Sequence, residues 1–172
     1  GFLEQVFACL DRLLRYHEKR IKVLSQKKAF MELSAVQRLA VLAVFLPKES
    51  DVEHLLQALT LARKDQYYIK ILYRLSGLYR NNITPKAKDI LRFLEISTAF
   101  HHEEIFYSLK KSLSLLREED SNSFSILDYD WNHILDALKK LPLKRQLVQL
   151  DALNRRQAVN TLRETAIVKI IE

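Results

Sequence analysis

Apolar residues recur every three or four positions along almost the whole chain, which is the spacing of one face of an α-helix. Leucine is the main apolar residue, at 31 of 172 positions, and it favours helices. The enrichment in β-branched and aromatic residues that strands show is missing. The 2 glycines and 3 prolines also leave little material for hairpin turns. The pattern therefore predicts an all-α protein of about nine helices.

Residues that commonly cap helices mark several of the expected starts. A capping box, in which two side chains satisfy free backbone N–H groups reciprocally, is expected at Ser34 with Gln37 and again at Ser50 with Glu53. Further N-terminal caps are expected at Asp65, at Thr84 followed by Pro85, and at Asp130. The first helix should cover about 2–26, and the last two about 142–153 and 156–171.

One helical phrase occurs twice, as HLLQAL at 54–59 and HILDAL at 133–138, and DILRFL at 89–94 has the same pattern. Each segment reads as two apolar residues, one polar residue and two more apolar residues. Such recurrence predicts a short stack of antiparallel helix hairpins, an α-solenoid of the HEAT-like kind, in which neighbouring units bury each other's apolar faces. The alternative is an irregular helical bundle, since any leucine-rich amphipathic helix produces this phrase. The pattern does not reach the motif of a particular family.

The length of 172 residues suits a single helical domain spanning 1–172. The chain begins with Gly-Phe-Leu, has its only methionine at Met31 and ends in an uncapped apolar segment, AIVKIIE. We therefore expect a fragment of a larger protein. Cys9, the single cysteine, cannot form an internal disulfide, and its apolar setting predicts a buried, inert thiol. Because disulfides are rare in reducing compartments, the single cysteine favours an intracellular location, in the cytoplasm or nucleus. No apolar run is long enough to cross a bilayer.

Basic residues are concentrated near the N-terminus and give two interpretations of the first helix. The net charge is +7, and residues 12–28 hold seven basic residues against one acid. Arg12, Arg15, Lys19 and Lys22 fall on one helical face. This face could bind the phosphates of nucleic acid or of an anionic membrane surface. Alternatively, it is a solvated surface with Asp11 and Arg15 as an i,i+4 ion pair.

The tyrosine-rich segment at 65–80 has two faces with different expected roles. The core face should contain Tyr68, Leu72, Leu75 and Tyr79. Tyr67, Lys70 and Arg74 share the opposite face, where an aromatic beside two basic residues suits a protein interface. The simpler interpretation is a tyrosine that lies over a neighbouring helix with its hydroxyl in water.

Catalytic and metal-binding patterns are weak. His101 and Glu104 are three residues apart, but two ligands do not make a metal site, and acids in a first turn are explained by the helix dipole. No nucleophile, base and orienting group can be grouped along the sequence. We therefore expect no metal, no cofactor and no enzymatic activity. The favoured function is a protein–protein interaction module, a helical-repeat scaffold or adaptor, with electrostatic binding of nucleic acid or anionic phospholipid as the alternative.

Overall fold

The computed structural model describes residues 2–81, 84–117, 124–143 and 152–171. Within these ranges it does not describe the side chains at 2–7, 9–10, 12–14, 16 and 152–153. The described residues form nine α-helices and one short 3-10 helix, η1, without a strand, so the all-α prediction is confirmed. The helix expected near 142–153 lies largely outside these residues, and so does the side chain of Cys9.

The helices up to Tyr79 follow one another with short connections. In chain order they are α1 (Phe2–Gln26), α2 (Lys28–Met31), α3 (Ala35–Ala43), α4 (Glu49–Ala58), α5 (Arg63–Tyr79), α6 (Ala87–Ile96), α7 (Glu103–Arg117), η1 (Ser125–Asp128), α8 (Trp131–Lys139) and α10 (Ala152–Ile171). The first helix has the predicted bounds, and the last begins four residues before the predicted start. The single turn of α2 was not expected.

Two of the expected N-terminal caps are confirmed by hydrogen bonds. Ser34 Oγ accepts from the Gln37 backbone N–H at 3.2 Å, and Gln37 Oε1 accepts from the Ser34 N–H at 2.8 Å, which completes a capping box at the start of α3. Asp130 Oδ1 accepts from the His133 N–H at 3.1 Å and caps α8. Both sites have the local geometry that their spacing predicts.

The other three expected caps are wrong, because the helices start at different residues. In α4 the N-cap is Lys48, and Ser50 lies inside the first turn. In α5 the N-cap is Ala62, so Asp65 also lies in the first turn, where the helix dipole favours a carboxylate. The start of α6 is set by the Asp89 carboxylate, which accepts from the Lys86 backbone N–H at 2.9 Å, and not by Thr84 and Pro85.

The first two apolar residues of the repeated leucine phrase are helical and buried in both copies, as its pattern predicts. Leu56 of α4 and Leu135 of α8 are 1% and 2% exposed. The copies differ at their last residue, since Leu138 is 4% exposed and Leu59, the C-cap of α4, is 39% exposed. The phrase therefore marks a buried helix face, but its two copies are not structurally equivalent.

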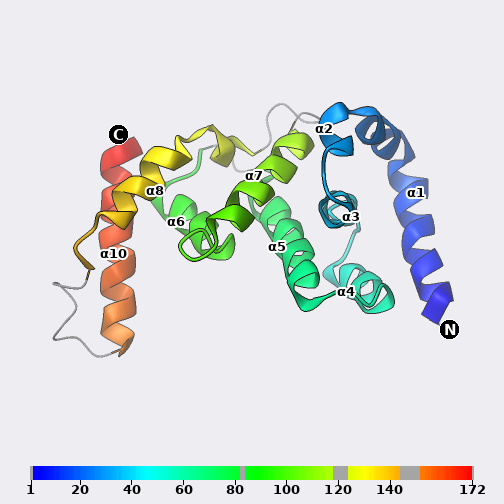
Figure 1. Ribbon diagram of the computed structural model, residues 1–172, viewed down its shortest axis with the longest axis horizontal. Helices are drawn as coiled ribbons and strands as arrows, with labels where there is room; N and C mark the ends of the chain where they lie inside the picture. The colour runs from blue at the N-terminus through cyan, green and yellow to red at the C-terminus, as the bar shows by residue number, and fades with distance from the viewer. Residues whose placement is uncertain (1, 82–83, 118–123, 144–151, 172) are drawn as a thin grey trace.

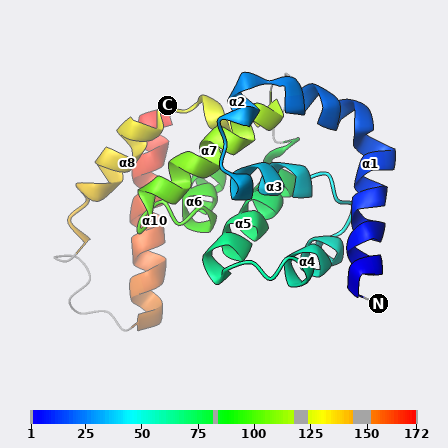
Figure 2. The ribbon, with the colours of Figure 1, turned by 45° about the vertical axis from the view of Figure 1, so that its right-hand side comes forward.

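The helices are arranged along the longest axis of the molecule, with α1 at one end and α10 at the other (Figures 1 and 2). The most extensive packing joins helices that are not consecutive in the sequence: α3 with α5, α6 with α10, and α1 with α4. One continuous core of apolar side chains runs from Leu24 to Ile167. Helix–helix packing of this kind is consistent with a helical bundle, and a regular repeat stack remains a prediction.

Candidate functional site

Helix α5 separates a buried face from an exposed one, as its sequence predicts. On the buried face, Leu72 and Leu75 are 0% exposed, and Tyr79 is 2% exposed. On the other face Tyr67 is 49% exposed, and Lys70 and Arg74 are exposed as well. A contact surface must be exposed, as these three residues are. Exposure alone does not test their predicted role in binding a partner, which stays a proposal.

The exposed face continues to Leu78, a residue that the sequence pattern did not single out. Leu78 follows Arg74 by one helical turn and is 38% exposed. We call the exposed surface formed by Tyr67, Lys70, Arg74 and Leu78 the α5 face. Leu78 lies four residues after Arg74, so the helical spacing of Tyr67, Lys70 and Arg74 places it on the same face. Its exposure could not be inferred from its apolar character.

An ion pair joins the α5 face to α4. Lys70 Nζ lies 2.9 Å from Glu53 Oε1, with about half of each side chain exposed. The hydrogen bond from Lys70, followed by its positive charge, lowers the pKa of Glu53 below its ordinary value. Lys70 is therefore held in place by its neighbour, which reduces the conformational freedom that it would lose on binding a partner.

Arg74 and Leu78 line a surface hollow of about 480 Å³ together with Glu49, Tyr73 and Gly77. Apolar, basic and acidic groups thus meet at one site, since Glu49 comes from the first turn of α4. Mixed polarity around an apolar contact is typical of protein interfaces. A surface that attracts nucleic acid or anionic lipid through charge alone would be more strongly basic.

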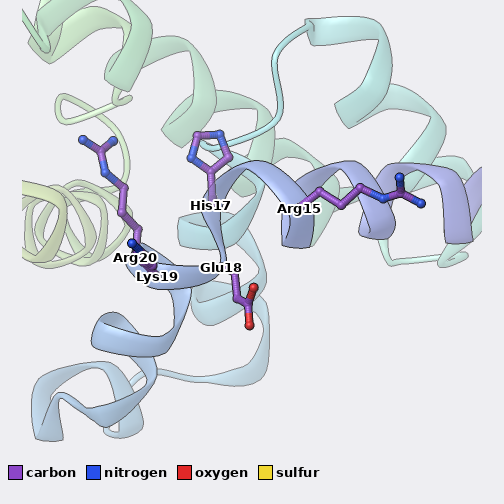
Figure 3. Close-up of a pocket in the computed structure, with 5 residues that line it drawn as sticks. All are labelled: Arg15, His17, Glu18, Lys19 and Arg20. Atoms are coloured by element: carbon purple, nitrogen blue, oxygen red, sulfur yellow. The ribbon is translucent and has the colours of Figure 1, made fainter.

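The structure describes three of the four basic residues predicted on one face of the first helix. Arg15 pairs with Asp11 at 2.8 Å, as the i,i+4 spacing predicts. Lys19 and Lys22 are exposed, while the side chain of Arg12 lies outside the described part of the structure. Figure 3 shows Arg15 extending along α1, away from the side to which His17 and Arg20 point. Arg15, His17, Glu18, Lys19 and Arg20 border a hollow of about 470 Å³.

Among the described residues, a partly buried polar network links three helices. Gln37 of α3 donates to Ser108 Oγ of α7, Ser108 donates to the Tyr68 hydroxyl at 3.0 Å, and Tyr68 is 3.0 Å from Ser112 Oγ. Burial raises the pKa of the Tyr68 phenol, although its hydrogen bonds oppose this shift. Hydrogen bonds from the Tyr68 phenol to hydroxyls and an amide thus join α3, α5 and α7.

The HHEE segment at the start of α7 makes one interhelical ion pair and one local contact. Glu103 pairs with Lys139 of α8, and Glu104 lies 3.5 Å from His102 Nδ1. In the described ranges, no group of three or more His, Cys, Asp or Glu side chains has an arrangement that could hold a metal ion. The described residues that line the hollows along α1 and α5 include neither His101 nor Glu104.

Comparison of the chain with protein-family models, with curated proteins and with solved structures finds no match. Among the helices that the structure describes, none has both the length and the apolar content needed to cross a bilayer. The function of the domain is therefore inferred from its exposed surfaces and from the groups that line them.

Proposed function

We propose that this domain is a non-catalytic protein–protein interaction module and that the α5 face contacts the partner. The observation that supports this most is the exposure of Tyr67 and Leu78 on one helix face, with Lys70 and Arg74 between them. A tyrosine and a leucine supply apolar area that a partner can bury, and arginine and tyrosine are enriched at binding hot spots.

The chemistry of this surface suggests an acidic, amphipathic partner segment. Tyr67 and Leu78 would contact its apolar residues, and Arg74 would bind a carboxylate. The net charge of +7 would accelerate the approach of an acidic partner at low salt. Because Lys70 already pairs with Glu53, it would contribute orientation more than a new ion pair.

The proposal is tested by replacing Tyr67 with a photo-reactive phenylalanine analogue and cross-linking in cells. The matched control carries the same analogue at Tyr107 of α7, a tyrosine that is 38% exposed and whose hydroxyl donates to Asn132. A partner captured from position 67 and lost after Arg74→Glu supports the proposal. Equal capture from both positions, or capture that is insensitive to Arg74→Glu, contradicts it.

Electrostatic binding through the first helix remains the second candidate, because Lys19 and Lys22 are exposed one turn apart on α1. In this case the affinity for DNA or for anionic vesicles would fall steeply with salt as counterions are released on association. Replacing Arg12, Arg15, Lys19 and Lys22 by glutamine should then abolish binding. Binding that persists at high salt, or in the fourfold variant, excludes this function.

A further inference from the structure

Two apolar side chains are exposed where α1 ends and α2 begins. Val23 is 51% exposed and Met31 is 58% exposed, more than any other large apolar side chain that the structure describes. Their sequence neighbours Leu24 and Phe30 are buried in the core. The buried pair therefore anchors this segment, and Val23 and Met31 are the apolar side chains that it leaves in solvent. We call residues 19–31 the α1–α2 corner.

The charged side chains of the α1–α2 corner are all positive. The corner contains five basic residues and no Asp or Glu, although Glu18 and Glu32 flank it. Lys27 is partly buried, and the other four basic residues are exposed. We call these four the corner cations: Lys19, Arg20, Lys22 and Lys28. In the described part of the chain, none of the corner cations forms an ion pair.

Helical spacing places cations beside each of the two exposed apolar side chains. On α1, Lys19 precedes Val23 by four residues, which is about one turn. On α2, Lys28 precedes Met31 by three residues. Only Lys27 separates the two helices, and its carbonyl oxygen accepts from the Met31 N–H at 3.2 Å. The apolar and the basic side chains are therefore presented by one short, hydrogen-bonded segment.

The α1–α2 corner lies at the outside of the molecule. In Figures 1 and 2 the end of α1 and the turn of α2 lie along the upper edge, whereas α4 lies toward the lower edge. An extended flat surface could therefore approach the corner without first meeting α4. A bilayer is such a surface, and docking on it requires only shallow insertion of a few side chains.

Exposed apolar side chains surrounded by cations favour an anionic bilayer as the partner. At such a membrane, lysine and arginine contact the lipid phosphates while apolar side chains enter the boundary between headgroups and acyl chains. A nucleic acid would bind the cations but would not need Val23 and Met31, and Phe30, the single aromatic residue of the corner, is too buried to stack on a base. Two apolar side chains also offer little area for a stable protein interface.

We propose that the α1–α2 corner docks on an anionic phospholipid bilayer, with Val23 and Met31 below the headgroups and the corner cations on lipid phosphates. This proposal does not depend on the α5 face. It goes beyond the electrostatic candidate for the first helix, which extends to Arg12 and Arg15 and gives no role to apolar side chains. Because the two share part of their charge, the experiments separate apolar contact from attraction by charge.

The first experiment measures sedimentation of the whole chain with vesicles of about three parts phosphatidylcholine to one part phosphatidylserine. The double variant Val23→Ser, Met31→Ser keeps every charge and should lower vesicle affinity by at least about tenfold. The control, Leu59→Ser, Leu78→Ser, changes two exposed leucines outside the corner and should leave the affinity unchanged. Thermal unfolding establishes that both variants are folded. Absence of wild-type binding, full affinity in the corner variant, or equal losses in both variants would overturn the proposal.

The second experiment compares the corner cations with the same number of charges elsewhere. Each of two triple variants replaces three exposed lysines: Lys19→Gln, Lys22→Gln, Lys28→Gln in the corner, and Lys48→Gln, Lys64→Gln, Lys88→Gln outside it. The corner variant should bind the same vesicles at least about tenfold more weakly than wild type, and the control should lose about threefold or less. Equal losses would reduce the binding to net charge and contradict a docking site.

The third experiment tests insertion by tryptophan fluorescence, with vesicles of the same headgroups whose acyl chains carry bromine as a quencher. An indole in Met31→Trp should be quenched, because its side chain would reach the acyl chains. Wild type, whose Trp131 is 1% exposed, and the control Leu59→Trp should show little quenching. Vesicle binding with equal quenching in Met31→Trp and Leu59→Trp would contradict insertion and leave only the electrostatic candidate.

Discussion

Lys70 Nζ of α5 lies 2.9 Å from Glu53 Oε1 of α4, so one of the cations proposed to contact a partner also joins two helices. Both side chains are about half exposed, and water screens such a pair. The contact therefore orients Lys70 and adds little to the stability of the fold. It also connects the α5 face to the acidic N-terminal half of α4, which contributes Glu49 and Glu53 to this side of the molecule.

The ion pair with Lys70 should lower the pKa of Glu53 below its ordinary value. The carboxylate form is favoured in the folded protein, so the pair is present above the ordinary pKa of 4.5 and is lost as the pH falls through the lowered value. A carbon-detected NMR titration of the Glu53 carboxyl group should give a pKa below 4.5. In Lys70→Gln the pKa should return to the ordinary value, and an unchanged pKa in this variant would show that Lys70 is not the cause.

At the end of α6, replacement of Thr98 by glycine should stabilise the fold. Its φ of 56° is left-handed, and the backbone around it forms a Schellman motif, with Ala99 N–H donating to Leu94 O and Thr98 N–H donating to Glu95 O. Glycine is the usual residue there, because a β-branched residue is strained at positive φ. We expect Thr98→Gly to be more stable than Thr98→Ala by about 1 kcal/mol.

The Thr98→Ala control removes the buried hydroxyl, which has no hydrogen-bond partner among the described residues, and keeps the Cβ atom at positive φ. Urea denaturation monitored by the fluorescence of the single tryptophan, Trp131, measures both variants. If glycine and alanine give the same free energy of unfolding, backbone strain at this position is not significant.

The two copies of the leucine phrase should respond differently to truncation at their last residue. Leu138 is 4% exposed, so Leu138→Ala should lower the free energy of unfolding by about 2–5 kcal/mol, because apolar burial is lost and a cavity is left behind. Leu59 is 39% exposed, so Leu59→Ala should lower the free energy of unfolding by about 1 kcal/mol or less. Equal losses in chemical denaturation would mean that the copies are equivalent, as a regular repeat requires.

Gly77→Ala should raise the free energy of unfolding by about 0.5–1 kcal/mol. Alanine restricts the unfolded chain and favours the helix, and the added Cβ atom enters open space. Thermal unfolding of this variant beside the wild type measures the effect. A lower transition midpoint would show that the space beside Gly77 is already used by packing.

The sequence predicts the helices well because their apolar spacing is local information. Tyr68 and Leu72 are buried and Tyr67 is exposed, as the 3.6-residue period requires. The Ser34–Gln37 capping box is also local and is confirmed. Ser50 and Asp65 lie in the first turn and not at the N-cap. Serine and aspartate are favourable at both positions, so the sequence does not distinguish them.

The surface features required information that the sequence does not carry. The pairing of Lys70 with Glu53 depends on which helices lie side by side, and so does the hollow lined by residues of α1 and α5. Extensive packing of α1 with α4 and of α6 with α10 brings together distant segments, and no single-sequence pattern specifies such contacts. The exposure of Leu78 likewise depends on how the described helices pack around α5, which leaves this position partly uncovered.

The proposal that the α5 face binds a partner is tested most directly by the triple variant Tyr67→Ala, Lys70→Glu, Arg74→Glu. The measurement is its affinity for the partner cross-linked at position 67, beside a control with the same types of substitution, Tyr107→Ala, Lys88→Glu, Arg92→Glu, at exposed residues of α6 and α7. We predict an affinity loss of at least about tenfold in the first variant, with a thermal midpoint within about 2 °C of wild type, and unchanged affinity in the control. Wild-type affinity in the first variant, or equal losses in both variants, would contradict this account.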